Sequence, residues 1–420
     1  MSSTPAHDSF AALRYPEFRA LCGLSFLLTA AIQVLNVAVG WALYQVTRDP
    51  LVLGLVGLAE AIPFIVLALA GGYLADQRDK RDMMRRMLAM MLLIALGLVA
   101  WMRPETRAAV GETRWLAGIY GALMLLGFAR GLFTPSATAL RAFVVPRALY
   151  PNASAWSGTA WQSGAVIGPA VGGLIYAAFG LTATLLGISV LIAGAWAMTL
   201  PLQARPPTQV RAAGESVLQN VSEGLRFVYR TPVILYALGL DLLCVLFGGV
   251  VAILPMFADD ILNTGPQGLG LLRAAPAVGA ILTILVCTRY TPTRHAWRNL
   301  LIACFGFGAA TLLFAISTHF WLSMVALFAT GAFDSVSVVV RNTLLQVYTP
   351  DALRGRVQAV NSVFISASNE IGAFESGLAA KLMGAVPSVI FGGVATLTIT
   401  AEIARRSRAL LRLRVDEDSR

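Results

Sequence analysis

Long apolar stretches recur along the chain, and each is followed by a short polar segment. They cover approximately residues 20–45, 51–75, 84–103, 115–140, 153–177, 181–201, 232–257, 268–288, 298–317, 320–346, 357–381 and 386–404. About 20 consecutive apolar residues are enough for an α-helix to cross the hydrocarbon core of a bilayer. The pattern therefore predicts an all-α membrane protein with twelve transmembrane helices.

Composition leads to the same class. Hydrophobic residues make up 57% of the 420 positions and charged residues 13%, whereas soluble domains have about 45–50% apolar and about 25% charged residues. Such a chain cannot bury its apolar surface in a water-soluble core, so the lipid bilayer is its expected surrounding.

The basic residues predict an orientation. If both termini lie on one side, 25 of the 32 Lys and Arg residues fall on that side, and the opposite loops hold Arg48, Arg103, Arg107, Arg114 and Lys381. Short loops rich in Lys and Arg stay in the cytoplasm, which predicts a multi-pass protein of the bacterial inner membrane with both termini cytoplasmic. Topology and anionic lipid then account for the net charge of +10, and no nucleic-acid partner is implied.

The chain contains an internal repeat. Gly127-Phe-Ala-Arg130 aligns with Gly331-Ala-Phe-Asp334 at an offset of 204 residues, and the segment 57–63 aligns with 270–276 at 213. Repeats of this kind build transporters from two halves related by an axis along the membrane normal. We expect an N-terminal six-helix half at 1–201, a cytoplasmic linker with a short surface helix at 202–230, and a C-terminal half with a basic tail at 231–420.

Two sequence motifs carry a family resemblance. The first is the loop after the second stretch, with Gly72, Asp76, Lys80 and Arg81; the second is a glycine-proline block in the fifth stretch, with Gly164, Gly168, Pro169, Gly172 and Gly173. Together they resemble the major facilitator superfamily, and the flanks 10–19, 41–58 and 349–377 are similar to its enterobactin-exporter-like branch. Gln77 and Asp79 depart from the loop pattern.

The resemblance implies roles for these motifs. The loop would act as a conformational switch, and the glycine-proline block would accompany export rather than import. Arg130 falls where the family's fourth helix often has an Arg associated with proton coupling. The alternative for the glycine-proline block is a structural role. Its small residues would let helices pack closely, and Pro169 would bend the helix.

Ionisable residues inside the spans are the candidate transport residues. A charge at the bilayer centre costs at least about 2.5–3.5 kcal/mol, so each should face water, cargo or a partner. The candidates for transport and proton coupling are Arg130, Asp334, Glu370, Glu375 and Asp241. A carboxyl group in a low-dielectric setting can exchange a proton near neutral pH, and Glu370 is the acid nearest mid-depth. The alternative for each is a structural hydrogen bond to a neighbouring helix.

Glu60 and Arg273 occupy equivalent positions in the two halves, near the outer ends of their helices. The resemblance implies that these helix ends approach each other when the outer side is closed, so opposite charges there would form an outer gate pair. The alternative is that each side chain reaches the interface separately.

The remaining residues argue against enzymes and cofactors. The four cysteines and three histidines have no metal-ligand spacing, and no G-x-x-x-x-G-K-[ST] loop is present. We expect no metal, no cofactor and no homo-oligomer, hence a monomer. The prediction is a secondary exporter that exchanges protons for a siderophore-like or amphiphilic small molecule. The alternatives are an importer, a lysophospholipid-flippase-like transporter, a transporter-shaped sensor and a membrane enzyme.

Overall fold

The computed structural model describes residues 8–77, 79–204, 217–290, 292 and 295–412. Every regular element within these residues is helical. The longer helices are α1 (Pro16–Thr47), α2 (Pro50–Gln77), α3 (Lys80–Trp101), α5 (Glu112–Val144), α6 (Tyr150–Ala197), α8 (Pro232–Gly248), α10 (Gly265–Arg289), α11 (Ala296–Ile316), α12 (Phe320–Tyr348), α13 (Asp351–Met383) and α14 (Ala385–Arg406).

Shorter helical elements connect or extend these. They are α4 (Pro104–Val110), α7 (Val217–Arg230) and α9 (Leu254–Met256), the 3-10 turns η1 (Ala11–Arg14), η2 (Arg147–Leu149), η3 (Val251–Ile253) and η5 (Arg408–Arg412), and the π-helical turn η4 (Phe257–Ile261). The segment from α8 to η4 forms one span, Pro232–Ile261.

Twelve spans follow from these helices. Ten described stretches are long and apolar enough to cross a membrane, and one of them, Arg147–Ala197, contains two spans. The two meet at Gly180, whose φ of 76° breaks α6 in a conformation that side-chain-bearing residues rarely adopt. The twelfth is α13, which is 33 residues long but more polar than the others. A polar helix can stand in a membrane when its polar face is buried in protein or lines water.

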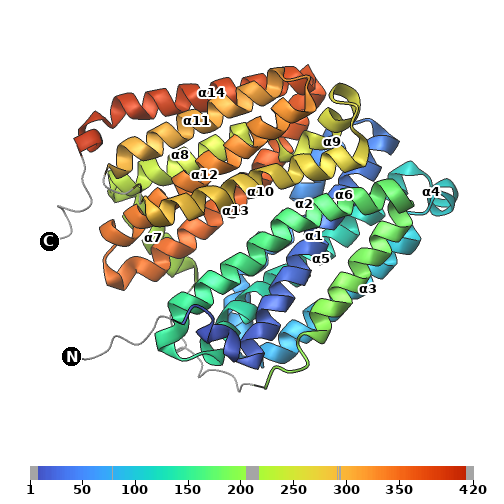
Figure 1. Ribbon diagram of the computed structural model, residues 1–420, viewed down its shortest axis with the longest axis horizontal. Helices are drawn as coiled ribbons and strands as arrows, with labels where there is room; N and C mark the ends of the chain where they lie inside the picture. Colours follow the sequence, from blue (N-terminus) through green and yellow to red (C-terminus); the bar gives the residue numbers. More distant parts are fainter. Residues whose placement is uncertain (1–7, 78, 205–216, 291, 293–294, 413–420) are drawn as a thin grey trace.

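The helices form two bundles that diverge toward the end where both termini lie (Figure 1). In the first bundle α1 packs on α6 and α2 on α5; in the second, α10 and α11 pack on α12. The bundles touch along two seams, α2 with α13 and α6 with α10. We call the end that carries both termini the terminal end. The opposite end, with residues 48–49, 259–264 and 381–384, is called the closed end.

Glycines allow the seams to close. A Cβ added to Gly377 of α13 would lie 2.8 Å from Gly54 Cα of α2, and one added to Gly173 of α6 would lie 2.4 Å from the carbonyl oxygen of Pro266 in α10. Both distances are too short for a side chain, so the backbones touch directly. These contacts lie toward the closed end of each helix, which is why the bundles are joined there and separate toward the terminal end.

Helix α7 occupies the second half of the linker expected at 202–230. It packs on α13 and α8, and Glu223 forms an ion pair of 2.5 Å with Arg356 near the start of α13. The linker helix is therefore fixed to the second bundle at the terminal end.

Candidate transport site between the two bundles

A charged cluster joins α2, α5 and α13 near the middle of the molecule. Arg130 of α5 donates from Nη1 to Oε1 of Glu60 on α2 in an ion pair. Glu370 of α13 lies within electrostatic range of both residues. We call Glu60, Arg130 and Glu370 the central cluster; Glu60 and Arg130 belong to one bundle and Glu370 to the other.

Two glycines bring Arg130 to its partner. A Cβ on Gly127 would lie 2.0 Å from the backbone oxygen of Glu60, and a Cβ on Gly131 would lie 2.9 Å from Cβ of Leu67. Because these positions flank Arg130, α5 lies directly against α2 at this depth. The guanidinium group also stands 5.6 Å from the centre of the Phe64 ring, a cation–π contact that adds to its stabilisation.

Glu370 reaches the cluster across the seam. Its Oε2 lies 3.0 Å from the position that a Cβ on Gly57 would take, so a side chain at residue 57 would push it away from α2. Glu60 is 8% exposed, so water hardly reaches this site. A second negative charge, that of Glu370, is therefore costly here because Arg130 already pairs with Glu60. When all three groups are ionised, the cluster holds two negative charges and one positive charge. Uptake of one proton makes it neutral, which is the chemistry that proton coupling requires.

A second buried ion pair lies within the C-terminal bundle. Arg341 of α12 pairs through Nη1 with Oδ1 of Asp241 on α8, and their side chains are 1% and 6% exposed. Asp334 stands two turns before Arg341 on α12 and lines the same small cavity as Asp241, together with Cys244 and Ser337. Sequence reasoning named both aspartates as candidates, but it did not name Arg341.

The repeat therefore supplies different chemistry at equivalent positions. Arg130 and Asp334 correspond by sequence, and the glycine three residues before each packs on a backbone oxygen, that of Glu60 for Gly127 and that of Pro276 for Gly331. Arg130 pairs with an acid of its own bundle, whereas Asp334 lies beside an existing Asp–Arg pair. The packing is repeated while the charges are not.

The expected outer gate pair of Glu60 and Arg273 is not formed in this structure. Glu60 pairs with Arg130 instead, and Arg273 of α10 donates from Nη2 to the carbonyl oxygen of Val251 at 3.3 Å. The cause is the order of the helices, because α2 lies against α13 while α10 lies against α6. Equivalent depth in the two halves therefore does not bring these side chains together.

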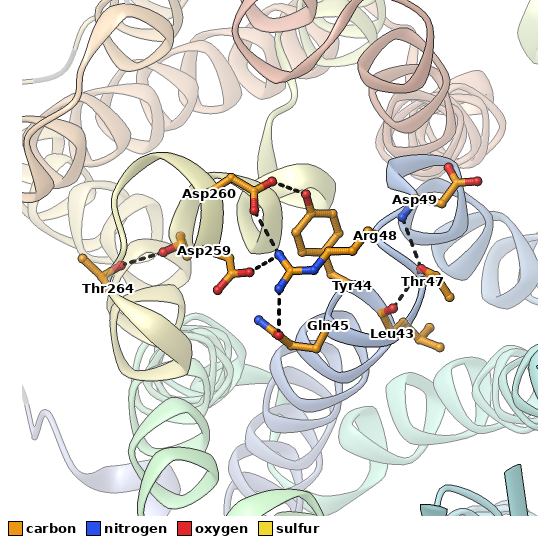
Figure 2. A network of polar contacts seen from close by, with 10 residues as sticks. Leu43, Tyr44, Gln45, Thr47, Arg48, Asp49, Asp259, Asp260 and Thr264 are labelled. Carbon is orange, nitrogen blue, oxygen red and sulfur yellow. Dashed lines mark hydrogen bonds and ion pairs between the residues drawn. The ribbon is translucent and has the colours of Figure 1, made fainter. Parts of the chain in front are cut away.

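A different ion-pair network joins the bundles at the closed end (Figure 2). Arg48, which follows α1, pairs with Asp259 and Asp260 of η4, the latter at 3.0 Å, and Tyr44 donates to Asp260. Lys381 of α13 pairs with Asp49 at 2.6 Å. The hydrogen bond to Asp259 raises the pKa of Arg48 above its usual value. We call Arg48, Asp49, Asp259, Asp260 and Lys381 the closed-end network.

Sequence reasoning missed this network. Its signal is weak: one Arg and one Asp between the first two spans, an Asp doublet at the end of the seventh, and a lone Lys after the eleventh. Nothing in the chain says which of these charges meet, because the partners are more than 200 residues apart.

The other candidate residues are distributed as follows. Glu375 is partly buried and forms no ion pair with any described residue. In the switch loop, Gly72 and Asp76 lie in α2, but their side chains fall outside the described residues, as does residue 78. Lys80 is buried beneath the Phe143 ring at 5.6 Å, and Arg81 pairs with Asp82 at 3.1 Å.

The glycine-proline block of α6 packs on two helices at once. Added Cβ atoms would lie 2.8 Å from Phe26 O for Gly164, 2.9 Å from Ala30 O for Gly168 and 3.1 Å from Val34 for Gly172, all on α1. Gly173 and Pro169 face α10, where a Cβ on Gly270 would lie 2.4 Å from the Pro169 oxygen. The block therefore ties its own bundle together and forms half of the seam with the other.

Comparison with known proteins decides the family. The sequence pattern of the Major Facilitator Superfamily matches residues 21–406. The chain belongs to this superfamily. It is 28% identical over 396 residues to the enterobactin exporter EntS of Escherichia coli O1:K1 / APEC, an alignment that covers 92% of this chain and 90% of that protein.

Solved transporters share the fold of this superfamily member. A bacterial homolog of the human lysosomal transporter Spinster, in an inward-facing and unoccupied conformation, superposes with a TM-score of 0.73 and 14% identity, over 98% of this chain and 99% of that one. The D-xylose-proton symporter superposes with a TM-score of 0.69 and 13% identity, over 94% and 97%. Because the chain belongs to the Major Facilitator Superfamily and has the spans described above, it is a multi-pass membrane transporter and not an enzyme.

Proposed function

We propose that this transporter is an exporter of the inner membrane that moves a small amphiphilic or siderophore-like molecule outward in exchange for protons. Both termini would face the cytoplasm, as the distribution of Lys and Arg predicts. The structure would then represent the state open to the cytoplasm and closed on the outside.

The central cluster is the observation that carries the proposal. It places two carboxyl groups beside one guanidinium group, and Glu370 comes from the opposite bundle. Ionised Glu370 is attracted to Arg130 and draws α13 toward α2 and α5. Protonation removes that attraction, so occupation of one site by a proton changes how strongly the two bundles hold together at this depth.

Export and a siderophore-like cargo are supported by the similarity to EntS. Cargo would bind near the middle of the membrane between the bundles, as in transporters built from two repeats. Asp334 and the Asp241–Arg341 pair are the corresponding charged groups of the C-terminal bundle, and Glu375 is a further acid on α13.

The test is transport by purified protein in liposomes. A pH gradient is imposed, a pH-sensitive dye follows proton movement, and enterobactin is supplied as the probe. The parent should move protons only when the probe is present, in the direction opposite to the probe. Glu370→Gln keeps the size and hydrogen bonding of the side chain but removes the proton site, so gradient-driven flux should be lost while probe binding persists.

Glu375→Gln is the matched control on the same helix. Five residues separate the two acids, which places them about 140° apart around α13, and Glu375 lies outside the central cluster, so its exchange should have a smaller effect. Transport against a gradient by Glu370→Gln at the parent's rate would exclude Glu370 as the proton carrier. Proton movement in the same direction as the probe would identify a symporter and refute export by exchange.

A further inference from the structure

A cavity of about 530 Å³ lies in the N-terminal bundle at the terminal end, between α1, α5 and the start of α6. Its wall combines aromatic rings with hydroxyl groups: Phe18, Tyr150 and Trp161, with Ser25, Thr138 and Ser157. Trp161 is 55% exposed, so much of its ring can contact another molecule. Ligand sites in proteins have volumes in this range and a similar mixture of apolar surface and a few polar groups.

Among the residues that the structure describes, Arg141 is the one charged residue that lines this cavity. It stands near the end of α5 and is partly buried, and it forms no ion pair with any acidic residue that the structure describes. Arginines in spans almost always pair with an acid or face water or a ligand. Arg130 pairs with Glu60 and Arg341 with Asp241, whereas Arg273 of α10 donates to the backbone carbonyl oxygen of Val251. The guanidinium group of Arg141 is therefore available to bind a molecule in the cavity.

A polar stripe connects this cavity with the central cluster. Arg130, Thr134, Thr138 and Arg141 follow each other on α5 at steps of four, four and three residues, which places them on one face of the helix. Thr134 and Thr138 are exposed. The eleven residues from Arg130 to Arg141 correspond to a rise of about 16 Å. A small molecule bound at Arg141 therefore lies where the polar stripe begins, near the terminal end. From there the stripe leads to the central cluster.

We propose that this cavity is an anion-binding subsite for the cargo: Arg141 binds an anionic group while Trp161 and Tyr150 cover a flat apolar body. The substrate class is therefore an amphiphilic anion with an aromatic or similarly flat moiety. A guanidinium group prefers carboxylate and phosphate because it donates two parallel hydrogen bonds, and aromatic side chains supply large contact areas with little loss of conformational freedom. The assignment rests on the proposed function as a transporter of amphiphilic molecules and names the chemistry of its cargo.

Binding is measured without any gradient, in nanodiscs of phosphatidylcholine, by titration calorimetry with empty nanodiscs as the blank. The probes are 2-naphthoate and its neutral analogue 2-naphthamide. The parent should bind 2-naphthoate more tightly than the amide. Arg141→Gln should raise the Kd of 2-naphthoate at least about tenfold, which corresponds to about 1.4 kcal/mol, and should leave the Kd of 2-naphthamide within about twofold.

Two further variants keep the test specific. Arg86→Gln removes an exposed positive charge near the start of α3, away from the cavity wall, and should leave both Kd values unchanged. Trp161→Leu removes the ring and should weaken both probes alike. Retained 2-naphthamide binding in Arg141→Gln shows that the variant is folded. Equal affinity for the two probes in the parent, or an unchanged 2-naphthoate Kd in Arg141→Gln, overturns the subsite.

The source of the anion is resolved by competition. Displacement of 2-naphthoate by lysophosphatidylglycerol but not by lysophosphatidylcholine identifies a lipid headgroup as a ligand of the subsite, and resistance to both identifies a soluble organic anion. Equal displacement by both lysolipids shows an apolar groove without anion selectivity and refutes the proposal. Failure of the proposed function is a separate result: lost proton exchange with intact, Arg141-dependent binding contradicts the coupling and leaves the subsite in place.

Discussion

Arg48→Gln tests whether the closed-end network holds the two bundles together. The side chain of Arg48 forms ion pairs with Asp259 and Asp260, which belong to the other bundle. Gln keeps a polar side chain but removes the charge. Residue 48 has a φ of 52°, a strained conformation for Arg and Gln alike, so the exchange leaves the backbone cost nearly unchanged.

The magnitude follows from exposure. Because the Arg48 side chain is 52% exposed, water screens its ion pairs, and each is worth about 0.2–1 kcal/mol. Loss of both pairs should weaken the closed end by roughly 0.5–2 kcal/mol, which shifts the ratio of closed to open molecules by about 2- to 30-fold. The Lys381–Asp49 pair remains and limits the effect.

Distances between spin labels measure this ratio. One pair of labels at Ala108 and Thr318 reports on the closed end, and a second pair at Ala155 and Gln346 reports on the terminal end; the four native cysteines are first replaced. In Arg48→Gln the first distance should gain a longer population while the second gains a shorter one. High salt should produce the same shift in the parent, because it screens exposed charges.

Arg107→Gln is the matched control for this experiment. Arg107 lies at the same end and pairs with Glu112 at 2.9 Å, but both residues belong to the N-terminal bundle. Its loss removes a comparable exposed ion pair without touching the connection between bundles. If Arg107→Gln shifts the distances as much as Arg48→Gln does, or if neither shifts them, the network has no role in closing this end.

Three further predictions concern other parts of the molecule. Asp241→Asn should lower stability by about 3–5 kcal/mol because it leaves Arg341 buried without a counter-charge, and Asp241→Asn combined with Arg341→Met should recover most of that loss in thermal unfolding; additive losses would contradict a coupled pair. Gly173→Ala should open the α6–α10 seam, since its Cβ would lie 2.4 Å from an oxygen, whereas Gly187→Ala on the same long helix meets nothing within 4 Å and should be neutral. Cysteines introduced at Asp79 and Thr106 should react with membrane-impermeant reagents from opposite sides, and labelling from one side would refute the proposed topology.

The sequence predicted the membrane spans well and the contacts between them poorly. Apolar length placed the twelve spans, and the charge of each candidate residue followed from its identity. The pairing of Glu60 depended on which helices adjoin α2, and a single sequence carries no direct record of that order. The repeat suggested Arg273 by equivalence of position, whereas packing at Gly127 brought Arg130 to Glu60 instead.

The polar helix α13 shows the same limit of prediction from a single sequence. Its apolar length marked it as a span, and its polar residues marked it as functional, but periodicity alone could not say which face meets α2. The structure adds that Glu370 lies against Gly57 and that Glu375 does not join the central cluster. The glycines that permit such contacts are recognisable in sequence only as small residues, and their partners are known only once the bundles are assembled.

The proposed proton site and the proposed anion subsite together predict the sign of the coupling between cargo binding and protonation, provided that cargo stays at Arg141. Ionised Glu370 draws α13 toward Arg130 and favours the state in which the cavity at Arg141 is accessible from the terminal end. Cargo that binds this state must then favour deprotonation of Glu370, because coupling between two sites is reciprocal. Binding should therefore release protons, and cargo affinity should fall as the pH is lowered through the range where Glu370 titrates.

Cargo that moves on to Arg130 would reverse the sign of this coupling. An anion that travels along the polar stripe to Arg130 would displace the carboxylate of Glu370 from the guanidinium group, and the displaced carboxylate would bind a proton. Binding would then take up protons, which is the behaviour of a symporter. Calorimetry of 2-naphthoate binding in two buffers of different ionisation enthalpy counts the protons released or taken up, and Glu370→Gln should abolish that exchange in either case. Proton release by the parent supports exchange transport through separate sites, whereas uptake would mean that cargo and Glu370 compete for the same arginine.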